Sequence, residues 1–215
     1  MSDLPIAART SYIERADRLL AVLRASYGVP RSTRTVIAVG GESGCGKSVT
    51  AIDLAAVLTD AGIGAAIIHQ DDYFIRPPRT NHEHRERDVT SVGPHEVQWD
   101  LIRHQITAFR SGAATLIGPV VNYPENRFDT QELDLRGCDV LVVEGTYALL
   151  HADADIRIFL EATYLDTAAA RHTRNRDIDA PFVQQVLAIE HAIIAPQARL
   201  ADVLISRDYQ ITLRR

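Results

Sequence analysis

Short apolar runs rich in β-branched residues recur along the chain, and most of their positions are hydrophobic rather than every second one. Such runs are typical of strands that are buried on both faces of a parallel sheet. They predict five strands, at residues 35–39, 65–69, 139–143, 156–160 and 203–206.

Segments with apolar residues at helical spacing lie before and between these runs. They predict helices at residues 10–27, 49–58, 97–109, 166–176 and 181–195. The first helix ends at Gly28 and Pro30, and its apolar face indicates a packing element rather than a targeting peptide. The polar, proline-containing stretch 75–94 has no predicted helix or strand, and 114–131 is expected to form a hairpin or a long loop.

Apolar strands that alternate with helices predict an α/β fold in which helices cover both faces of a parallel sheet. With 215 residues, the chain is long enough for one domain with a substantial core. We expect an N-terminal helical extension at residues 1–30, followed by the main domain at residues 31–215.

The composition is that of a soluble globular protein, with 46 % hydrophobic and 24 % charged residues. A net charge of −5 gives no electrostatic reason to expect nucleic acid as a partner, so an anionic ligand needs local positive groups. The two cysteines predict no disulfide framework. No signal-peptide pattern or membrane-length apolar run occurs, and we therefore expect a cytoplasmic protein with no membrane partner.

The strongest chemical signal follows the first predicted strand. Gly41-Glu42-Ser43-Gly44-Cys45-Gly46-Lys47-Ser48 fits G-x-x-x-x-G-K-[ST], the phosphate-binding loop (P-loop) of nucleotide-using proteins, and Val49 begins the next predicted helix. Glycines let backbone N–H groups turn inward, and the helix N-terminus adds about half a positive charge facing the phosphates. The order of strand, glycine loop and helix predicts that residues 41–49 bind ATP.

Lys47 is the only lysine among the 23 basic residues counted as Lys or Arg. A compact ammonium reaches between the β- and γ-phosphates, and a planar guanidinium is a poor replacement for it. Coding bias is the alternative explanation for an arginine-rich chain, but it does not explain why the one lysine lies in this motif. The hydroxyl of Ser48 is predicted to bind Mg²⁺.

Acidic residues close two predicted strands, at the sheet edge where ligands collect in such folds. Asp71 and Asp72 follow the second strand, and Glu144 follows the third. Phosphoryl transfer to a hydroxyl needs a carboxylate that accepts the proton, and Mg²⁺ that neutralises phosphate charge. Asp71 suits the first role and is also a candidate Mg²⁺ ligand, while Glu144 suits the second role. Helix capping or a turn is the alternative for these acids.

Three arginines, Arg171, Arg174 and Arg176, lie at the end of the predicted helix 166–176. Arginines on a helix end can close over the phosphates as a lid and stabilise the charge of the transition state, an effect worth about 10³–10⁵ in rate. A solvated charged surface is the alternative. Which arginine contributes most stays open.

These motifs together resemble the uridine kinase family of P-loop small-molecule kinases, with its nicotinamide riboside kinase and phosphoribulokinase relatives. Besides the P-loop, the matching pieces are Gln-Asp-Asp-Tyr-Phe at 70–74, Val-Glu-Gly-Thr-Tyr-Ala-Leu at 143–149, the arginine segment at 171–177 and Leu-Ala-Asp-Val-Leu-Ile at 200–205. The resemblance implies a P-loop NTPase fold with a five-stranded parallel sheet and a mobile lid. It assigns Asp71 as the base that deprotonates the acceptor hydroxyl, and it places Tyr73 against the acceptor.

The residues that would contact the acceptor depart from the family pattern. Pyrimidine nucleoside kinases have a Tyr-Asp-Phe…His stretch that reads the base, whereas the comparable stretch here, 121–128, lacks that histidine. The segment 79–99 also has its own sequence, so the acceptor does not follow from the resemblance. The candidate acceptor-binding residues are Asp71, Tyr73, His95, Tyr123 and Arg127.

We expect an ATP- and Mg²⁺-dependent kinase of a small-molecule hydroxyl, with a nucleoside or similar ribosyl compound as the favoured acceptor. A specialised kinase of a sugar, vitamin precursor or natural product is one alternative, and a nucleotide-binding switch with slow hydrolysis is another. Because a switch needs no hydroxyl base, Asp71→Asn separates it from a kinase. Members of the family often associate, which leaves a homo-oligomer open.

Overall fold

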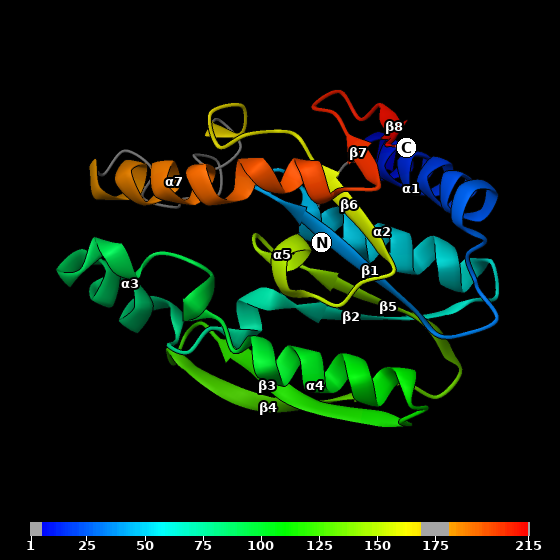
Figure 1. Cartoon of the computed structure of the whole chain (residues 1–215), viewed down its shortest axis with the longest axis horizontal. Helices are drawn as coiled ribbons and strands as arrows, with labels where there is room; N and C mark the ends of the chain where they lie inside the picture. The colour runs from blue at the N-terminus through cyan, green and yellow to red at the C-terminus, as the bar shows by residue number, and fades with distance from the viewer. Residues whose placement is uncertain (1–5, 169–180, 215) are drawn as a thin grey trace.

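The computed structural model describes residues 6–168 and 181–214, with side chains from residue 12 onward. A six-stranded sheet in the order β2-β5-β1-β6-β7-β8 forms its centre (Figure 1). Its first five strands run parallel. They are β2 (Gly64–His69), β5 (Cys138–Glu144), β1 (Thr35–Gly41), β6 (Ile156–Leu160) and β7 (Val203–Ile205). All five strands coincide with predicted ones, which confirms the parallel sheet.

The sixth strand is absent from the sequence prediction. β8 (Ile211–Leu213) pairs antiparallel with β7 and extends the expected five-stranded sheet at its edge. The reversal between the two strands is tight, because the Ser206 N–H donates to the Gln210 carbonyl and Tyr209 adopts a φ of 63°. Two of the three residues of β8 are exposed, so it lacks the apolar run by which the other strands were predicted.

Helices cover both faces of the sheet in the described part of the chain. They are α1 (Ile6–Tyr27), α2 (Lys47–Asp60), α3 (Pro78–Arg87), α4 (Trp99–Arg110), α5 (Ala148–His151) and α7 (Pro181–Ile194). The short 3₁₀ helices are η1 (Gln70–Tyr73), η2 (Val89–Ser91), η3 (Pro94–Glu96) and η4 (Ala195–Leu200). The predicted helix 10–27 is confirmed but begins at Ile6, and the predicted helix 166–176 lies mostly outside the described residues.

α3 corrects the expectation that 75–94 lacks regular structure. The helix is polar at nearly every position, so the segment has no hydrophobic period from which a helix could be predicted. Pro78 occupies its first turn, where a missing backbone N–H breaks no helical hydrogen bond. Tertiary contacts must therefore stabilise this helix, because its apolar surface is too small to do so.

Alternate side chains of the central strand β1 pack into two different cores. Ile37 and Val39 share one core with the buried leucines of α1 and α2, whereas Val36 and Ala38 share the other with α4 and α5. All four side chains are fully buried. The burial of both faces explains why this strand is apolar throughout instead of alternating.

The segment after α4 forms a second, two-stranded sheet. β3 (Thr115–Asn122) and β4 (Arg127–Asp134) pair antiparallel, which confirms the expected hairpin and extends it past residue 131. Figure 1 shows this hairpin running along α4. The Val121 backbone N–H donates to the Asp72 carboxylate at 2.8 Å, so the hairpin is tied to the carboxyl end of β2. For Asp72, this contact indicates a structural role, because it joins η1 to strand β3.

Candidate active site

The P-loop connects the carboxyl end of β1 to α2 and turns on glycines with positive φ. Gly41, Gly44 and Gly46 have φ values of 145°, 82° and 102°. At Gly41, a Cβ atom would lie 2.7 Å from Cys45 Sγ and 2.8 Å from the Leu160 carbonyl oxygen, so only glycine fits there. Because Gly46 directly precedes α2, the loop ends at a helix N-terminus, which is a favourable position for an anion.

Lys47 lies over this loop. Its Nζ donates a hydrogen bond to the Glu42 carbonyl oxygen at 2.9 Å. Burial would lower the pKa of Lys47, but the neighbouring Cys45, Glu144 and Asp71 raise it above its usual value. The ammonium therefore stays charged, as a phosphate ligand must.

The Glu42 side chain points to other partners. Its carboxylate is 4 % exposed, accepts a hydrogen bond from the Tyr164 backbone N–H at 2.7 Å, and lies 2.7 Å from His191 Nδ1. Glu42 thus links the P-loop to α7 and to the segment after β6. The sequence motif assigns Glu42 to the nucleotide site only because the residue lies within the P-loop. No feature of the motif predicts its contacts with Tyr164 and His191.

Ser48 and Glu144 lie in contact, and their role as Mg²⁺ ligands stays a prediction. Ser48 Oγ donates to Glu144 Oε1 at 3.0 Å, and His69 Nδ1 lies 2.8 Å from the same oxygen. Burial would raise the pKa of Glu144, but His69 and Lys47 lower it, so the carboxylate is ionised at neutral pH. His69 was missed by the sequence analysis, although its place at the end of β2, next to the acidic pair, is a signal that could have indicated it.

Gln70 connects the carboxyl ends of β2 and β5, which lead to Asp71 and Glu144. This fully buried side chain accepts a hydrogen bond from the Tyr147 backbone N–H at 2.9 Å and donates to Thr146 Oγ1 at 3.1 Å. A Cβ atom on Gly145 would lie 2.3 Å from Gln70 Cβ, so the glycine after Glu144 makes room for it. The 70–74 and 143–149 motifs therefore fit one another in space. Asp71, which follows Gln70, is exposed at this edge of the sheet.

The other candidate acceptor residues lie in different surroundings. Tyr73 is 4 % exposed in the core, and its hydroxyl donates to Gln105 Oε1 at 2.6 Å. Tyr123 is 61 % exposed on the hairpin turn, and Arg127 pairs there with acidic neighbours. His95 is exposed in η3. A contact of these residues with the acceptor stays a prediction.

The three lid arginines, Arg171, Arg174 and Arg176, lie outside the described residues. The lid therefore stays a prediction as well.

A buried ion-pair network that the sequence did not indicate connects three elements near the site. Arg85 of α3 donates to both oxygens of Glu96 at 2.8 and 2.7 Å, and its Nη1 lies 3.2 Å from Glu190 of α7. Asn81 donates to Glu96 at 3.0 Å. Figure 1 shows α3 and α7 at the same end of the molecule. These residues are far apart in the sequence, and α3 itself was not predicted, so no local pattern could have found them.

Tyr147 adds a further buried polar group beside this network, of which Glu190 is the member on α7. The Tyr147 hydroxyl has no hydrogen-bond partner among the described residues, and burial raises its pKa. Burial outweighs the opposing charge of Arg85 and also raises the pKa of Glu190. Because His191 of α7 lies 2.7 Å from the Glu42 carboxylate of the P-loop, α7 borders the site.

Both cysteines are free thiols and are buried. Burial raises the pKa of Cys45 and of Cys138, which lowers the thiolate fraction at neutral pH. We predict slow reaction of both with a thiol-specific reagent such as 5,5′-dithiobis(2-nitrobenzoic acid) at pH 7, and rapid reaction after unfolding in guanidinium chloride. Rapid reaction of the folded chain at either cysteine would contradict the buried positions.

Two features are absent from the part of the chain that the structure describes. No three His, Cys, Asp or Glu side chains gather in that part of the chain so as to hold a metal ion by themselves. Within the same residues, no helix combines the length and the apolar character that crossing a membrane requires.

Comparison with known proteins connects this geometry to a family. The sequence model of the phosphoribulokinase / uridine kinase family matches residues 36–210. A bifunctional alpha-galactosidase/sucrose kinase of Mediterraneibacter gnavus is 28 % identical over 190 residues, which are 81 % of this chain but 20 % of that longer protein. A uridine kinase of Ureaplasma urealyticum serovar 10 is 28 % identical over 159 residues, 69 % of this chain and 75 % of that protein.

A solved structure shares the fold. The phosphoribulokinase from Rhodobacter spheroides superimposes with a TM-score of 0.63 at 14 % identity, over 82 % of this chain and 71 % of that chain. The family match contains the P-loop, Asp71 and Glu144, and begins after α1. This chain therefore belongs to the phosphoribulokinase / uridine kinase family of P-loop kinases, which are ATP-dependent enzymes that phosphorylate a hydroxyl group.

Proposed function

We propose that this kinase transfers the γ-phosphate of ATP to a hydroxyl of a nucleoside or a similar ribosyl compound. The observation that supports the proposal most directly is the arrangement at the carboxyl ends of three neighbouring strands. β1 leads to Lys47 and Ser48, β5 ends in Glu144, and β2 leads to Asp71. A phosphate ligand, an oxygen donor set and an exposed carboxylate base thus share one edge of the sheet.

Each of these groups has a defined task in the proposed reaction. Lys47 and the loop amides bind the β- and γ-phosphates and hold the donor in place. Asp71 accepts the proton of the acceptor hydroxyl as the new O–P bond forms. We propose that one or more of Arg171, Arg174 and Arg176 stabilise the charge of the phosphoryl group during transfer.

The oxygen ligands at this edge fit Mg²⁺. Ser48 Oγ donates a hydrogen bond to the Glu144 carboxylate. Asp71, which follows β2 at the same edge of the sheet, is the second candidate carboxylate ligand. Mg²⁺ is usually held by one or two carboxylates together with substrate phosphates, so a protein-only cage of three acids is not required. When bound, the ion would neutralise phosphate charge. Ser48 and Glu144, with Asp71, would hold it.

The buried polar groups beside α7 support a hydroxyl-rich acceptor. Asp71 acts electrostatically on the partly buried Glu190 carboxylate and on the buried Tyr147 hydroxyl, so both polar groups lie near the proposed base. Hydrogen-bonding groups of this kind suit the hydroxyls of a ribose or of another sugar. A nucleobase needs a further contact, and the exposed ring of Tyr123 is the candidate for stacking.

A sugar is the second candidate acceptor. It is favoured by the similarity to the M. gnavus protein, whose name includes a sucrose kinase. Both candidates use the same donor site and the same base, so they differ only in the acceptor.

The test is a panel of nucleosides, ribosides and sugars incubated with ATP and Mg²⁺, with ADP release and product mass as readouts. Asp71→Asn is expected to lower kcat about 10²–10⁴-fold, because an amide cannot accept the proton. Asp72→Asn is the matched control. Its amide oxygen can still accept the hydrogen bond from Val121, so we expect nearly unchanged turnover.

The outcomes separate the candidates. Product from a nucleoside or riboside, lost in Asp71→Asn, supports the proposal, and product from a sugar alone supports the second candidate. ADP release that needs no acceptor and is unchanged in Asp71→Asn would instead indicate a nucleotide-driven switch.

A further inference from the structure

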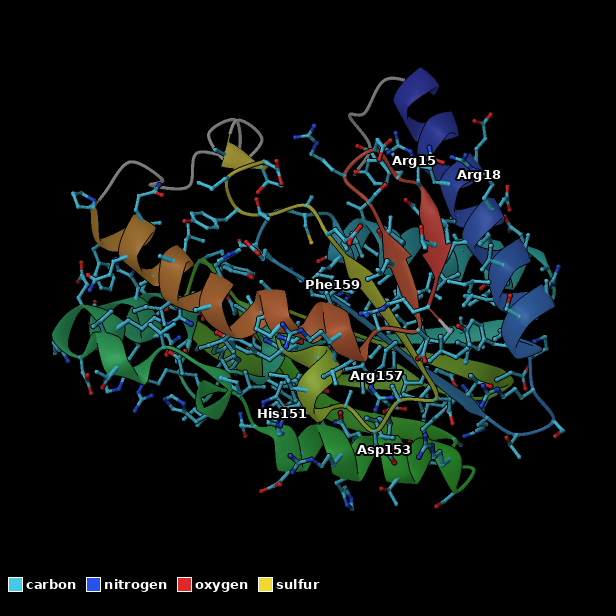
Figure 2. All side chains as sticks on the ribbon, turned by 45° about the horizontal axis from the view of Figure 1, so that its top comes forward. Arg15, Arg18, His151, Asp153, Arg157 and Phe159 are labelled. Atoms are coloured by element: carbon cyan, nitrogen blue, oxygen red, sulfur yellow. The ribbon has the colours of Figure 1, made fainter. Side chains whose placement is uncertain are left out.

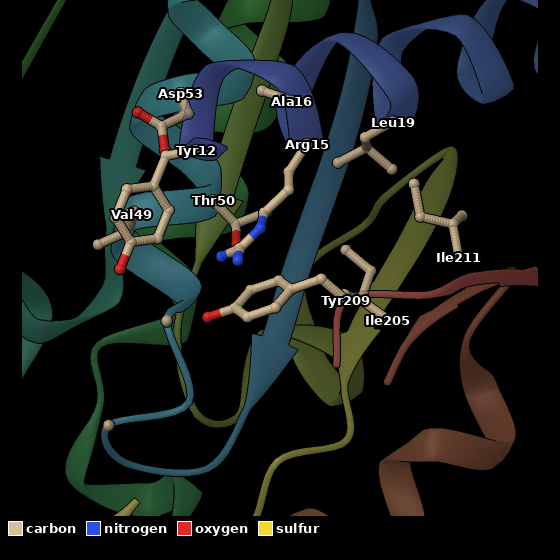
Figure 3. A pocket seen from close by; sticks show the side chains of 12 residues that line it. Tyr12, Arg15, Ala16, Leu19, Val49, Thr50, Asp53, Ile205, Tyr209 and Ile211 are labelled. Atoms are coloured by element: carbon tan, nitrogen blue, oxygen red, sulfur yellow. The ribbon is translucent and has the colours of Figure 1, made fainter. Parts of the chain in front are cut away.

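A pocket of about 160 Å³ opens beside the P-loop, and α1 forms one of its walls (Figure 3). The other walls come from the loop and the first turns of α2, from β7, and from the turn that leads into β8. Gly44 and Gly46 of the P-loop belong to the lining, so the pocket adjoins the position where phosphates bind. Neither the mechanism proposed above nor the sequence motifs assign it a role.

The pocket combines apolar walls with a stacked cation. Val49, Ile205 and Ile211 supply apolar surface. The guanidinium of Arg15 lies 3.7 Å from the centroid of the Tyr209 ring and 5.1 Å from that of Tyr12. Figure 3 shows Arg15 reaching down from α1 to lie between Thr50 and the ring of Tyr209. The flat cation is thus held against an aromatic ring at the edge of the cavity.

These features fit a planar heterocycle. A closed apolar cavity of about 150 Å³ holds a benzene-sized ring, and this pocket is slightly larger and open on one side. Guanidinium planes and aromatic rings both stack on nucleobases, whichever base is present. Because the pocket adjoins the P-loop, a ring inside it and phosphates on the loop can belong to one molecule.

We propose that α1 is part of the nucleotide site, and that Arg15, backed by Tyr209, binds the base of the phosphate donor. The proposal rests on the kinase function, because it takes the P-loop to hold the donor's phosphates. It assigns a ligand contact to a helix that precedes the family-matched segment, which begins at residue 36. Arg15 is a donor-binding residue in this scheme, and it takes no part in the transfer itself.

α1 is anchored firmly enough to fix the position of Arg15. Leu19, Leu20 and Leu23 are buried in the core that also contains Ile37 of the central strand. At the end of the helix, the Tyr27 hydroxyl donates to the Asp202 carbonyl oxygen at 3.1 Å. The helix therefore holds Arg15 as a preorganised surface, which limits the entropy lost on binding.

The test compares a ligand that has a base with one that has none. Dissociation constants of ADP and of inorganic tripolyphosphate are measured by isothermal titration calorimetry on the full chain. We expect Arg15→Ala to weaken ADP binding about tenfold, the loss typical of one stacking contact, and to leave tripolyphosphate binding nearly unchanged. Arg15→Lys keeps the positive charge but removes the planar guanidinium. It should therefore also weaken the binding of ADP and leave the binding of tripolyphosphate unchanged.

Arg18→Ala is the matched control, because Arg18 lies on the same helix but is exposed and does not line the pocket (Figure 2). It should bind both ligands like the unmodified chain, and thermal melting confirms that each variant is folded. Unchanged ADP affinity in both Arg15 variants, with normal turnover, would overturn this proposal and leave the kinase function intact. Failure of the unmodified chain to bind either ligand would contradict the kinase function itself.

Discussion

Replacing Lys47 with alanine is expected to lower kcat/KM by at least about 10³-fold while the chain stays folded. Lys47 is the one lysine of the chain, and its ammonium lies over the P-loop. From there it can stabilise the negative charge of the phosphoryl group during transfer. The substitution removes the hydrogen bond from Lys47 Nζ to the Glu42 carbonyl, so the free energy of unfolding should fall by about 1 kcal/mol. ADP release with a productive acceptor measures the activity, and circular dichroism melting measures the stability.

Lys47→Arg is the control for charge alone. If a compact ammonium is required, this variant should recover little activity, because a guanidinium is larger and planar. Near-normal rates in Lys47→Ala would refute the phosphate-binding role. Full activity in Lys47→Arg would show that charge suffices, and that the retention of lysine in this arginine-rich chain has no chemical reason.

Replacing Arg85 with methionine is expected to lower the free energy of unfolding by about 3–5 kcal/mol. Glu96 is 1 % exposed and accepts hydrogen bonds from Arg85 through both of its oxygens. Removal of the guanidinium leaves a buried carboxylate without its charged partner, and also breaks the connection from α3 to Glu190. Denaturant unfolding followed by circular dichroism measures the loss.

The pH dependence identifies the electrostatic origin of this effect. Burial would raise the pKa of Glu96, but hydrogen bonds from Arg85 and from the Gly93 N–H lower it below its usual value. This stabilisation is therefore present at neutral pH and is lost as the pH falls through the lowered pKa. In Arg85→Met the unpaired carboxyl should take up a proton at higher pH. The stability difference between the two proteins should therefore shrink on acidification.

Arg103→Met is the matched control, since Arg103 pairs with Asp100 at the surface. An exposed pair contributes less than about 1 kcal/mol. The double variant Arg85→Met/Glu96→Gln should be more stable than Arg85→Met alone, because it removes the unpaired charge. A loss for Arg85→Met no larger than for Arg103→Met would contradict the assigned role of the network.

The sequence by itself determined the parallel sheet, and it predicted the P-loop half of the proposed site. The parallel strands β1, β5 and β6 are buried at nearly every position, and β2 and β7 are apolar as well, so each strand appears as a short, local apolar run. The P-loop is also contiguous, and its glycines, lysine and serine have the spacing that its backbone geometry requires. Ser48 and Glu144 could be paired in advance because both follow carboxyl ends of strands, which meet at one edge of a parallel sheet.

Only the tertiary structure decided the helix α3, the ion-pair network around Arg85, and the contacts of Arg15 and Gln70. α3 lacks a hydrophobic period, and its network joins Arg85, Glu96 and Glu190 across a long stretch of chain. The contact of Arg15 with Tyr209 joins the first helix to the last turn of the chain, and Gln70 reaches the Gly145 turn from another strand. Polar contacts between distant segments leave no periodic trace in either segment, because each residue's partner is fixed by how the elements pack rather than by its neighbours in sequence.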